Sequence, residues 1–139
     1  MSPRNQNADA LWRKLVAAVM DTRDDWRRRV GEATGLPFGR VRALRRLVDG
    51  PRTLSELAEA TSSDAPATSV LVNDLEAKGL VVRAPHPTNR RAKLVSLTPA
   101  GRRVVERERA VTESAPAAFA NLSKDDLAAL ARVLDALGA

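Results

Sequence analysis

The sequence predicts a mainly α fold that contains one small β-hairpin. Three observations indicate this fold class. Stretches at both ends of the chain repeat apolar residues every three or four positions, which is the period of an amphipathic helix. The middle of the chain holds two short helical patterns joined by a tight turn, and two runs rich in β-branched residues follow them. The length of 139 residues corresponds to about one domain.

The first predicted helix extends from Asp9 to about Glu32. Its apolar side follows three- and four-residue steps along Leu11, Leu15, Val19, Thr22 and Trp26. A second helix is expected to open at Pro37, because the fixed φ of proline suits the start of a helix. Gly50 is expected to close this second helix as its C-terminal cap.

Capping residues place the next two helices. Thr53 and Glu56 form a Thr-x-x-Glu capping box, which predicts the start of a short third helix. Asp64 is the expected cap of a fourth helix that carries Pro66 in its first turn and continues to Gly79. Because only a few polar residues separate the two helices, they should be joined tightly.

A hairpin is predicted after the fourth helix. The runs "LVVRA" and "AKLVSL" are too short for helices and rich in β-branched residues, and the loop "PHPTNR" separates them. The stretch 83–103 around this loop contains six basic residues and no acidic one. The tip of the hairpin should therefore attract an anion.

The last third of the chain is predicted to be helical, with one interruption. Thr98 is the expected cap of a helix that kinks or breaks just before Pro116, because proline lacks a backbone donor and restricts the residue before it. Ser123 and Asp126 form a second capping pattern. The final helix should carry an apolar stripe that ends at Leu137.

Composition narrows the classes of partner. The net charge of +6 and the pI of about 10.9 favour a polyanion, and nucleic acid in preference to a membrane, since no segment is basic on one face and aromatic on the other. The absence of cysteine excludes a disulfide framework and a thiolate metal site. No apolar run reaches the roughly 18 residues that span a bilayer, and the N-terminus lacks an apolar signal core, so we expect a cytoplasmic protein.

Two short helices in a tight turn, followed by a hairpin, match the winged helix-turn-helix plan. In this plan the second helix enters the major groove of DNA, and the hairpin, called the wing, reaches the flanking backbone or minor groove. Here the second helix is the one capped by Asp64, and the basic hairpin is the wing. Double-stranded DNA is therefore the expected partner.

Three stretches in the middle of the chain resemble the central signature of the MarR family of bacterial transcription regulators. They are "LSELAEA", "LVNDLEAKGLVVR" and "HPTNRRAKLVSLTPAG". The resemblance covers roughly residues 37 to 105. It implies a single domain over residues 1–139, with a winged helix-turn-helix at 37–98, a wing at about 80–97, and dimerisation helices at 9–33 and 99–137. The implied assembly is a homodimer.

The resemblance also implies which residues contact DNA, and the chain departs from the family at two of these positions. Val70 stands where the family often has an arginine that could read guanine. Base reading then falls to Pro66, Ala67, Thr68, Ser69 and Asn73. Asn89 replaces the aspartate that commonly braces the wing-tip Arg91, so a neutral hydrogen bond is expected instead. The expected wing contacts are Asn89, Arg90, Arg91 and Lys93, and the alternative is a solvated basic loop.

Other basic residues are candidates for phosphate contacts. The arginines of the second helix and the following turn either touch phosphate or form an ordinary solvated helix face. They are Arg40, Arg42, Arg45, Arg46 and Arg52.

The family resemblance further implies a pocket for a small aromatic or phenolic ligand. The candidate lining residues are Met20, Trp26, Phe38 and Arg46, and the alternative for the tryptophan is core or dimer packing. His86 is the only histidine, so a metal site is not expected, and no nucleophile or phosphate-binding loop accompanies it. We therefore predict no enzyme activity and no cofactor.

The leading hypothesis is a homodimeric repressor that binds a pseudo-palindromic operator and leaves it when an aromatic ligand binds. The alternative is a winged-helix interaction module that uses the same basic surface to bind an acidic protein. A steep dependence of binding on salt, together with preference for its own promoter DNA, would favour the first hypothesis over the second.

Overall fold

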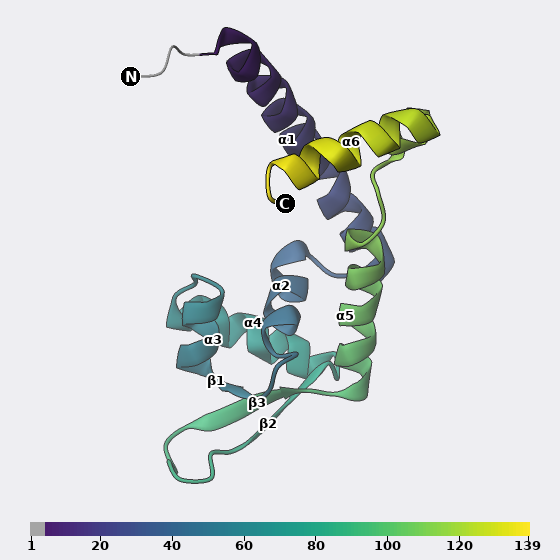
Figure 1. Cartoon of the computed structure of the whole chain (residues 1–139). Coiled ribbons are helices and arrows are strands. Elements are labelled where there is room, and N and C mark those ends of the chain that lie inside the picture. Colours follow the sequence, from purple (N-terminus) through teal and green to yellow (C-terminus); the bar gives the residue numbers. More distant parts are fainter. Residues whose placement is uncertain (1–4) are drawn as a thin grey trace.

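The computed structural model describes residues 5–139 and confirms a mainly helical fold with a small antiparallel sheet (Figure 1). The elements are α1 (Gln6–Thr34), α2 (Phe38–Arg46), β1 (Arg52–Thr53), α3 (Leu54–Ala60), α4 (Ala65–Ala77), β2 (Val81–Pro85), β3 (Lys93–Leu97), α5 (Pro99–Thr112), the 3₁₀ helix η1 (Ala117–Asn121) and α6 (Lys124–Ala136). Elements α2 to β3 form the lower part of Figure 1, and α1 and α6 lie above them. Helix α5 connects the two parts.

The side-chain caps predicted from the sequence begin four of the helices. Thr53 Oγ1 accepts the backbone N–H of Glu56 at 3.1 Å, and Glu56 Oε1 accepts the N–H of Thr53 at 3.2 Å. The hydrogen bond from the Thr53 backbone is the main reason that the pKa of Glu56 lies below its ordinary value. Equivalent side-chain caps begin α4, α5 and α6 at Asp64, Thr98 and Ser123. Local capping chemistry therefore sets most helix starts.

Two predicted helix ends are corrected by the structure. Helix α1 begins at Gln6 and not at Asp9, because the Asn5 side chain accepts two backbone N–H groups and caps an earlier turn. Helix α2 ends at Arg46, and Gly50 lies beyond it with a φ of 148°. After Arg46, backbone hydrogen bonds between residues three apart form a tight turn. Gly50 therefore belongs to this turn and does not cap the helix.

The sheet has three strands in the order β1-β3-β2, all antiparallel. The hairpin of β2 and β3 was expected, and its register pairs Val81 with Leu97. Strand β1 was not predicted, because its two residues, Arg52 and Thr53, carry no strand pattern of their own. It pairs with β3 through Arg52 and Val95. The sheet thereby ties the start of α3 to the base of the wing.

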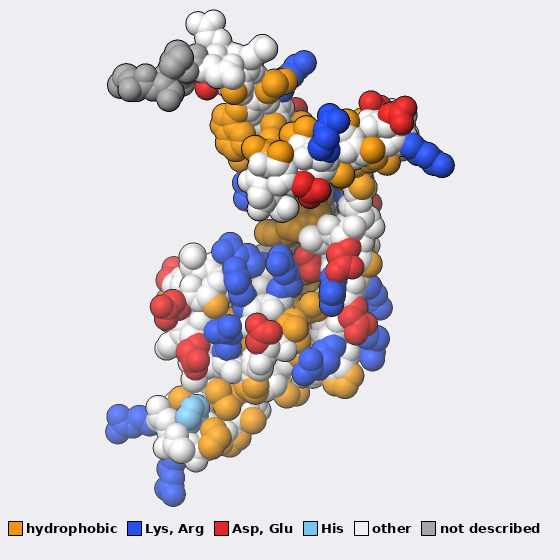
Figure 2. Space-filling model, in the orientation of Figure 1, with side chains coloured by type: hydrophobic (Ala, Val, Ile, Leu, Met, Phe, Trp, Pro, Cys, Tyr) orange, Lys and Arg blue, Asp and Glu red, His pale blue; other side chains and the backbone are white. Residues whose placement is uncertain are grey.

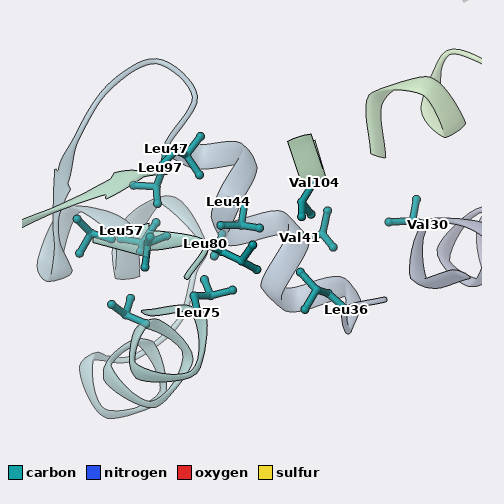
Figure 3. Packing of buried hydrophobic residues seen from close by; sticks show 14 residues of the cluster. Val30, Leu36, Val41, Leu44, Leu47, Leu57, Leu75, Leu80, Leu97 and Val104 are labelled. Atoms are coloured by element: carbon teal, nitrogen blue, oxygen red, sulfur yellow. The ribbon is translucent and has the colours of Figure 1, made fainter. Parts of the chain in front are cut away.

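The core lies where α2 meets α3, α4 and the sheet (Figure 3). Helices α2, α3 and α4 and strand β3 each contribute fully buried side chains to this core. They include Val41, Leu44, Leu57, Val72, Leu75 and Val95, each with no exposed surface. Because interiors are close-packed, these contacts fix the direction of α4 relative to the wing.

Gly101 marks the closest approach between α5 and the sheet. A Cβ atom at this position would collide with the carbonyl oxygen of Leu80, which is backbone and cannot rotate away. The Thr98 hydroxyl donates to the Gly79 carbonyl at 2.7 Å and holds the same junction from the other side. Only glycine fits between these segments.

We predict that Gly101→Ala lowers the free energy of unfolding by about 2 kcal/mol or more, because relief of the collision must shift backbone. Gly39→Ala is the matched control: the added Cβ meets nothing within 4 Å in α2. It should raise stability by up to about 1 kcal/mol through helix propensity. Urea denaturation of both variants checks this. Equal stability of the two variants would contradict the close approach.

Candidate nucleic-acid interface

Helices α3 and α4 form the helix-turn-helix, and a hydrogen-bonded turn fixes the angle between them. The buried hydroxyl of Thr61 donates to the Leu57 carbonyl at 2.8 Å, and the N–H of Ser63 bonds to the Ala58 carbonyl at 2.9 Å. Ser62 adopts a φ of 53°, a conformation that non-glycine residues rarely adopt. The turn is thus closed without glycine, and α4 leaves it in one defined direction.

The outward face of α4 carries most of the residues proposed to read bases. Pro66, Ala67 and Asn73 are exposed and Ser69 is half-buried. Thr68 lies on the opposite side and is 2% exposed, and its hydroxyl donates to the Asp64 carbonyl at 2.8 Å. This corrects the expectation for Thr68, because a buried, bonded side chain cannot reach a base edge.

A contact from the wing orients Asn73. Arg83 of β2 donates from Nη2 to Asn73 Oδ1 at 2.6 Å, and its Nε lies 4.0 Å from Glu76 Oε2. The same Nε is buried and makes no hydrogen bond. In the sequence Arg83 stands out only as one of the six basic residues of the stretch 83–103. The structure places Arg83 between α4 and the sheet, where it occupies the carbonyl oxygen of the exposed Asn73, and within residues 5–139 no hydrogen bond is found for the amide N–H groups of that asparagine.

The wing tip is a turn organised by His86. Its Nδ1 accepts the backbone N–H groups of Thr88 at 3.1 Å and Asn89 at 3.0 Å, so the ring is a hydrogen-bond acceptor there. Asn89 Oδ1 accepts the backbone N–H of Arg91 at 3.1 Å. The expected brace is therefore corrected: the asparagine holds the arginine's backbone and not its guanidinium.

Cationic side chains project from the end of the wing (Figure 2). Asn89, Arg90, Arg91 and Lys93 are all exposed. Within residues 5–139 no ion pair is found for Arg90, Arg91 or Lys93. Their charges are available to an anion outside the chain.

Several basic residues beside the helix-turn-helix are instead held within the chain. Arg40 Nε lies 3.4 Å from Asp74 Oδ2, and Lys78 Nζ bonds to the same carboxylate at 2.7 Å. These hydrogen bonds, that of Lys78 above all, keep the pKa of Asp74 below its ordinary value. Arg52 Nε donates to the carbonyl of Arg46 at 2.7 Å. Within residues 5–139 no ion pair is found for Arg42 or Arg46, so unpaired cations remain on α2 as well as at the wing tip.

Comparisons with known proteins agree with this arrangement. Residues 34–92, which include the helix-turn-helix and the wing tip, match the model of the MarR family. A structure of RV1404 from Mycobacterium tuberculosis shares 25% identity, with 99% of this chain and 97% of that chain covered and a TM-score of 0.76. Apo MarR from E. coli shares 23% identity over 88% of this chain and 96% of that one, with a TM-score of 0.66.

The resemblance to the MarR family is confirmed. Sco3205 from Streptomyces coelicolor, a MarR family transcriptional regulator solved in complex with DNA, shares the fold at 21% identity. The match covers 98% of this chain and 92% of that chain, with a TM-score of 0.61. A sequence search of curated proteins found no relative. The MarR fold thus extends over nearly the whole chain, beyond the segment that the family model matches.

The candidate ligand residues are only partly brought together in this MarR fold. Trp26 and Phe38 meet edge to face with centroids 5.0 Å apart, and the guanidinium of Arg27 lies 5.1 Å from the centre of the Phe38 ring. Met20 is 55% exposed on α1, and Arg46 is exposed at the end of α2. Trp26 also donates from Nε1 to Thr112 Oγ1 at 3.0 Å, which the sequence did not suggest.

A buried carboxylate at the junction of α2 and α5 was also missed by sequence reasoning. Glu108 is 3% exposed, accepts from the Thr112 hydroxyl at 2.8 Å and lies 3.6 Å from Arg45 Nη1. A shallow pocket beside it is lined by Val48, Val105 and Arg109 among others. No single residue signals this site, because its members come from α2, the turn after it and the distant helix α5. Within residues 5–139 no group of metal-ligating side chains and no membrane-spanning helix is found.

We predict that His86→Ala loosens the wing tip without changing global stability, because two backbone N–H groups lose their acceptor at an exposed turn. The amides of Thr88 and Asn89 should exchange faster and gain larger temperature coefficients in NMR spectra. His86→Asn is the matched control, since its Oδ1 can accept near the position of Nδ1. Unchanged tip amides in the alanine variant would show that the imidazole does not order the wing.

Proposed function

We propose that this protein is a DNA-binding transcriptional regulator that acts as a homodimer. The main support for the proposal is that the winged part of the chain exposes two surfaces suited to DNA. These are the outward face of α4 and the exposed cations at the wing tip, including Arg90 and Arg91. Helix α4 has the size and exposure to enter a major groove, and the wing can follow the adjacent backbone or minor groove.

The two contacts divide the work of recognition. Arg90, Arg91 and Lys93 neutralise phosphate or enter a narrow minor groove, which supplies affinity and register. Ser69 and Asn73 offer hydrogen-bonding groups to base edges from α4. Because no charged bidentate reader stands on the outward face, sequence preference should depend on weak contacts and on DNA shape.

Exposed apolar faces support the homodimer. On α1, Leu11, Trp12 and Val19 are 65%, 64% and 59% exposed. On α6, Leu127 is 44% exposed, and Leu137 at the C-cap of this helix is 70% exposed. Faces of this size usually mark an interface. A second copy that covers them would set two α4 helices about one DNA turn apart on a pseudo-palindromic operator.

We extend the proposal to repression that a small aromatic ligand relieves. The support is the position of Trp26 and Phe38, which lie where α1 meets the winged domain. A ligand there could release DNA only by binding better to a dimer whose α4 helices are wrongly spaced for adjacent major grooves. Footprinting on the DNA around its own gene, with and without aromatic acids, tests this part of the proposal.

We predict that Arg90→Ala with Arg91→Ala weakens binding to the operator and flattens its salt dependence. Each phosphate contact contributes about 0.9 to the slope of log affinity against log salt, so four lost charges in a dimer can remove up to about 3.6. Arg107→Ala with Arg132→Ala is the control, since both arginines are exposed outside the winged domain. Titrations of one operator at several salt concentrations measure the slope.

If the wing variant, still folded and dimeric, kept the parent's affinity and slope, the tip would be a solvated loop. Binding to an acidic protein with no binding to duplex DNA would instead favour an interaction module. The control pair should leave both the affinity and the slope unchanged.

We predict that Leu127→Glu with Leu134→Glu produces a monomer that fails to bind the operator, because two charges would face an apolar interface. These residues lie about two turns apart on one face of α6, and both are exposed in the single chain, so folding should persist. Ala128→Glu with Ala136→Glu places the same charges away from that face. Sedimentation equilibrium distinguishes the variants. A dimeric leucine variant would remove α6 from the interface.

A further inference from the structure

Val70 occupies the centre of the outward face of α4 and is 63% exposed. Helical spacing places it between Pro66, one turn before it, and Asn73, one turn after it. The buried positions Thr68, Val72 and Leu75 lie on the other side of the helix. A large apolar side chain therefore stands where the proposed function puts DNA.

Within residues 5–139 Val70 belongs neither to the buried core nor to the apolar residues that pack against it. The exposed apolar residues of α1 and α6 belong to the surface proposed for dimerisation, whereas Val70 lies in the winged domain. The nearest turns of α4 present Pro66 and Ala67, which are also apolar and exposed. Together these three residues make a small apolar strip along the first two turns of the helix.

The polar groups beside the strip limit what else this part of α4 can read. The Asn73 carbonyl oxygen accepts from Arg83 at 2.6 Å, so the amide of Asn73 faces outward mainly as a donor. The Ser69 hydroxyl is half-buried. An apolar strip beside weak hydrogen-bonding groups fits a part of the groove that contains both an apolar group and acceptors.

In the major groove the only apolar group on a base edge is the C5 methyl of thymine, and the O4 acceptor of the same base lies next to it. We propose that Val70 makes α4 a reader of thymine methyl groups, so that each operator half-site carries thymine beneath the apolar strip. This inference rests on the proposed function and names the base that α4 selects.

The test removes only the methyl group. Replacing thymine by deoxyuridine in each half-site keeps every hydrogen-bonding group of the base and deletes the C5 methyl. The parent protein should lose about fourfold in affinity for one methyl and about fifteenfold when both half-sites of a dimer are changed, from the transfer free energy of one buried methylene-sized group.

Protein variants separate direct contact from DNA shape, since loss of a methyl also alters the flexibility of DNA. Val70→Ala should bind thymine DNA more weakly than the parent and lose clearly less on the change to deoxyuridine. Val48→Ala is the control, because Val48 is 43% exposed beside α5 and away from α4. It should respond to deoxyuridine as the parent does. A change in DNA shape would affect all three proteins equally.

The outcomes distinguish failure of this inference from failure of the proposed function. If the parent binds its operator with a steep salt slope and shows the same affinity for deoxyuridine DNA at every thymine of the half-sites, the methyl contact is refuted and DNA binding stands. If all three proteins lose affinity equally, the effect belongs to DNA shape, and the inference is again refuted. If no duplex is bound at all, both fail.

Discussion

The arrangement of the whole molecule depends on the burial of α2 between two sets of partners. Val41, Ala43 and Leu44 are entirely buried, and α2 contacts α3 on one side and α5 on the other. Because a close-packed interior resists tilting of one member alone, α2 fixes the helix-turn-helix relative to the long helices. Helices α4 and α5 are thereby held in one frame, whereas α6, which lies far from α4 in Figure 1, buries no residue in the single chain.

Polar contacts also join α2, α5 and α1 and favour one relative position of these helices. Glu108 is buried between α5 and α2, and Thr112 and Arg45 both face its carboxylate. Thr112 in turn accepts from Trp26 of α1, so three helices meet through one connected set of polar groups. A buried charge is tolerated only when partners satisfy it. Thr112 lies on the same helix as Glu108 and moves with it, so a shift of α2 alone would take away the arginine that faces the carboxylate. A shift of α1 would break the hydrogen bond from Trp26 to Thr112.

The sequence predicted the helices well where local chemistry decides them. Caps such as Thr53 and Asp64 act within one turn, so a short pattern contains the whole signal. Contacts between distant segments were missed or misplaced. Thr68 was assigned to the reading face because helical spacing alone does not show which side the core covers. Likewise, the family's brace suggested a bond from Asn89 to a guanidinium, whereas the turn made by His86 directs it to backbone.

The contact between Gly101 and Leu80 has a mechanical consequence. With no side chain between the two backbones, α5 cannot rotate at its first turn without carrying β2 along. Each strand of the wing has five residues, and such a strand spans about 17 Å. A rotation of about 10° at the base then moves the tip by about 3 Å, roughly the length of one hydrogen bond. A slight tilt of α5 would therefore move the wing tip far enough to separate an arginine there from a DNA phosphate.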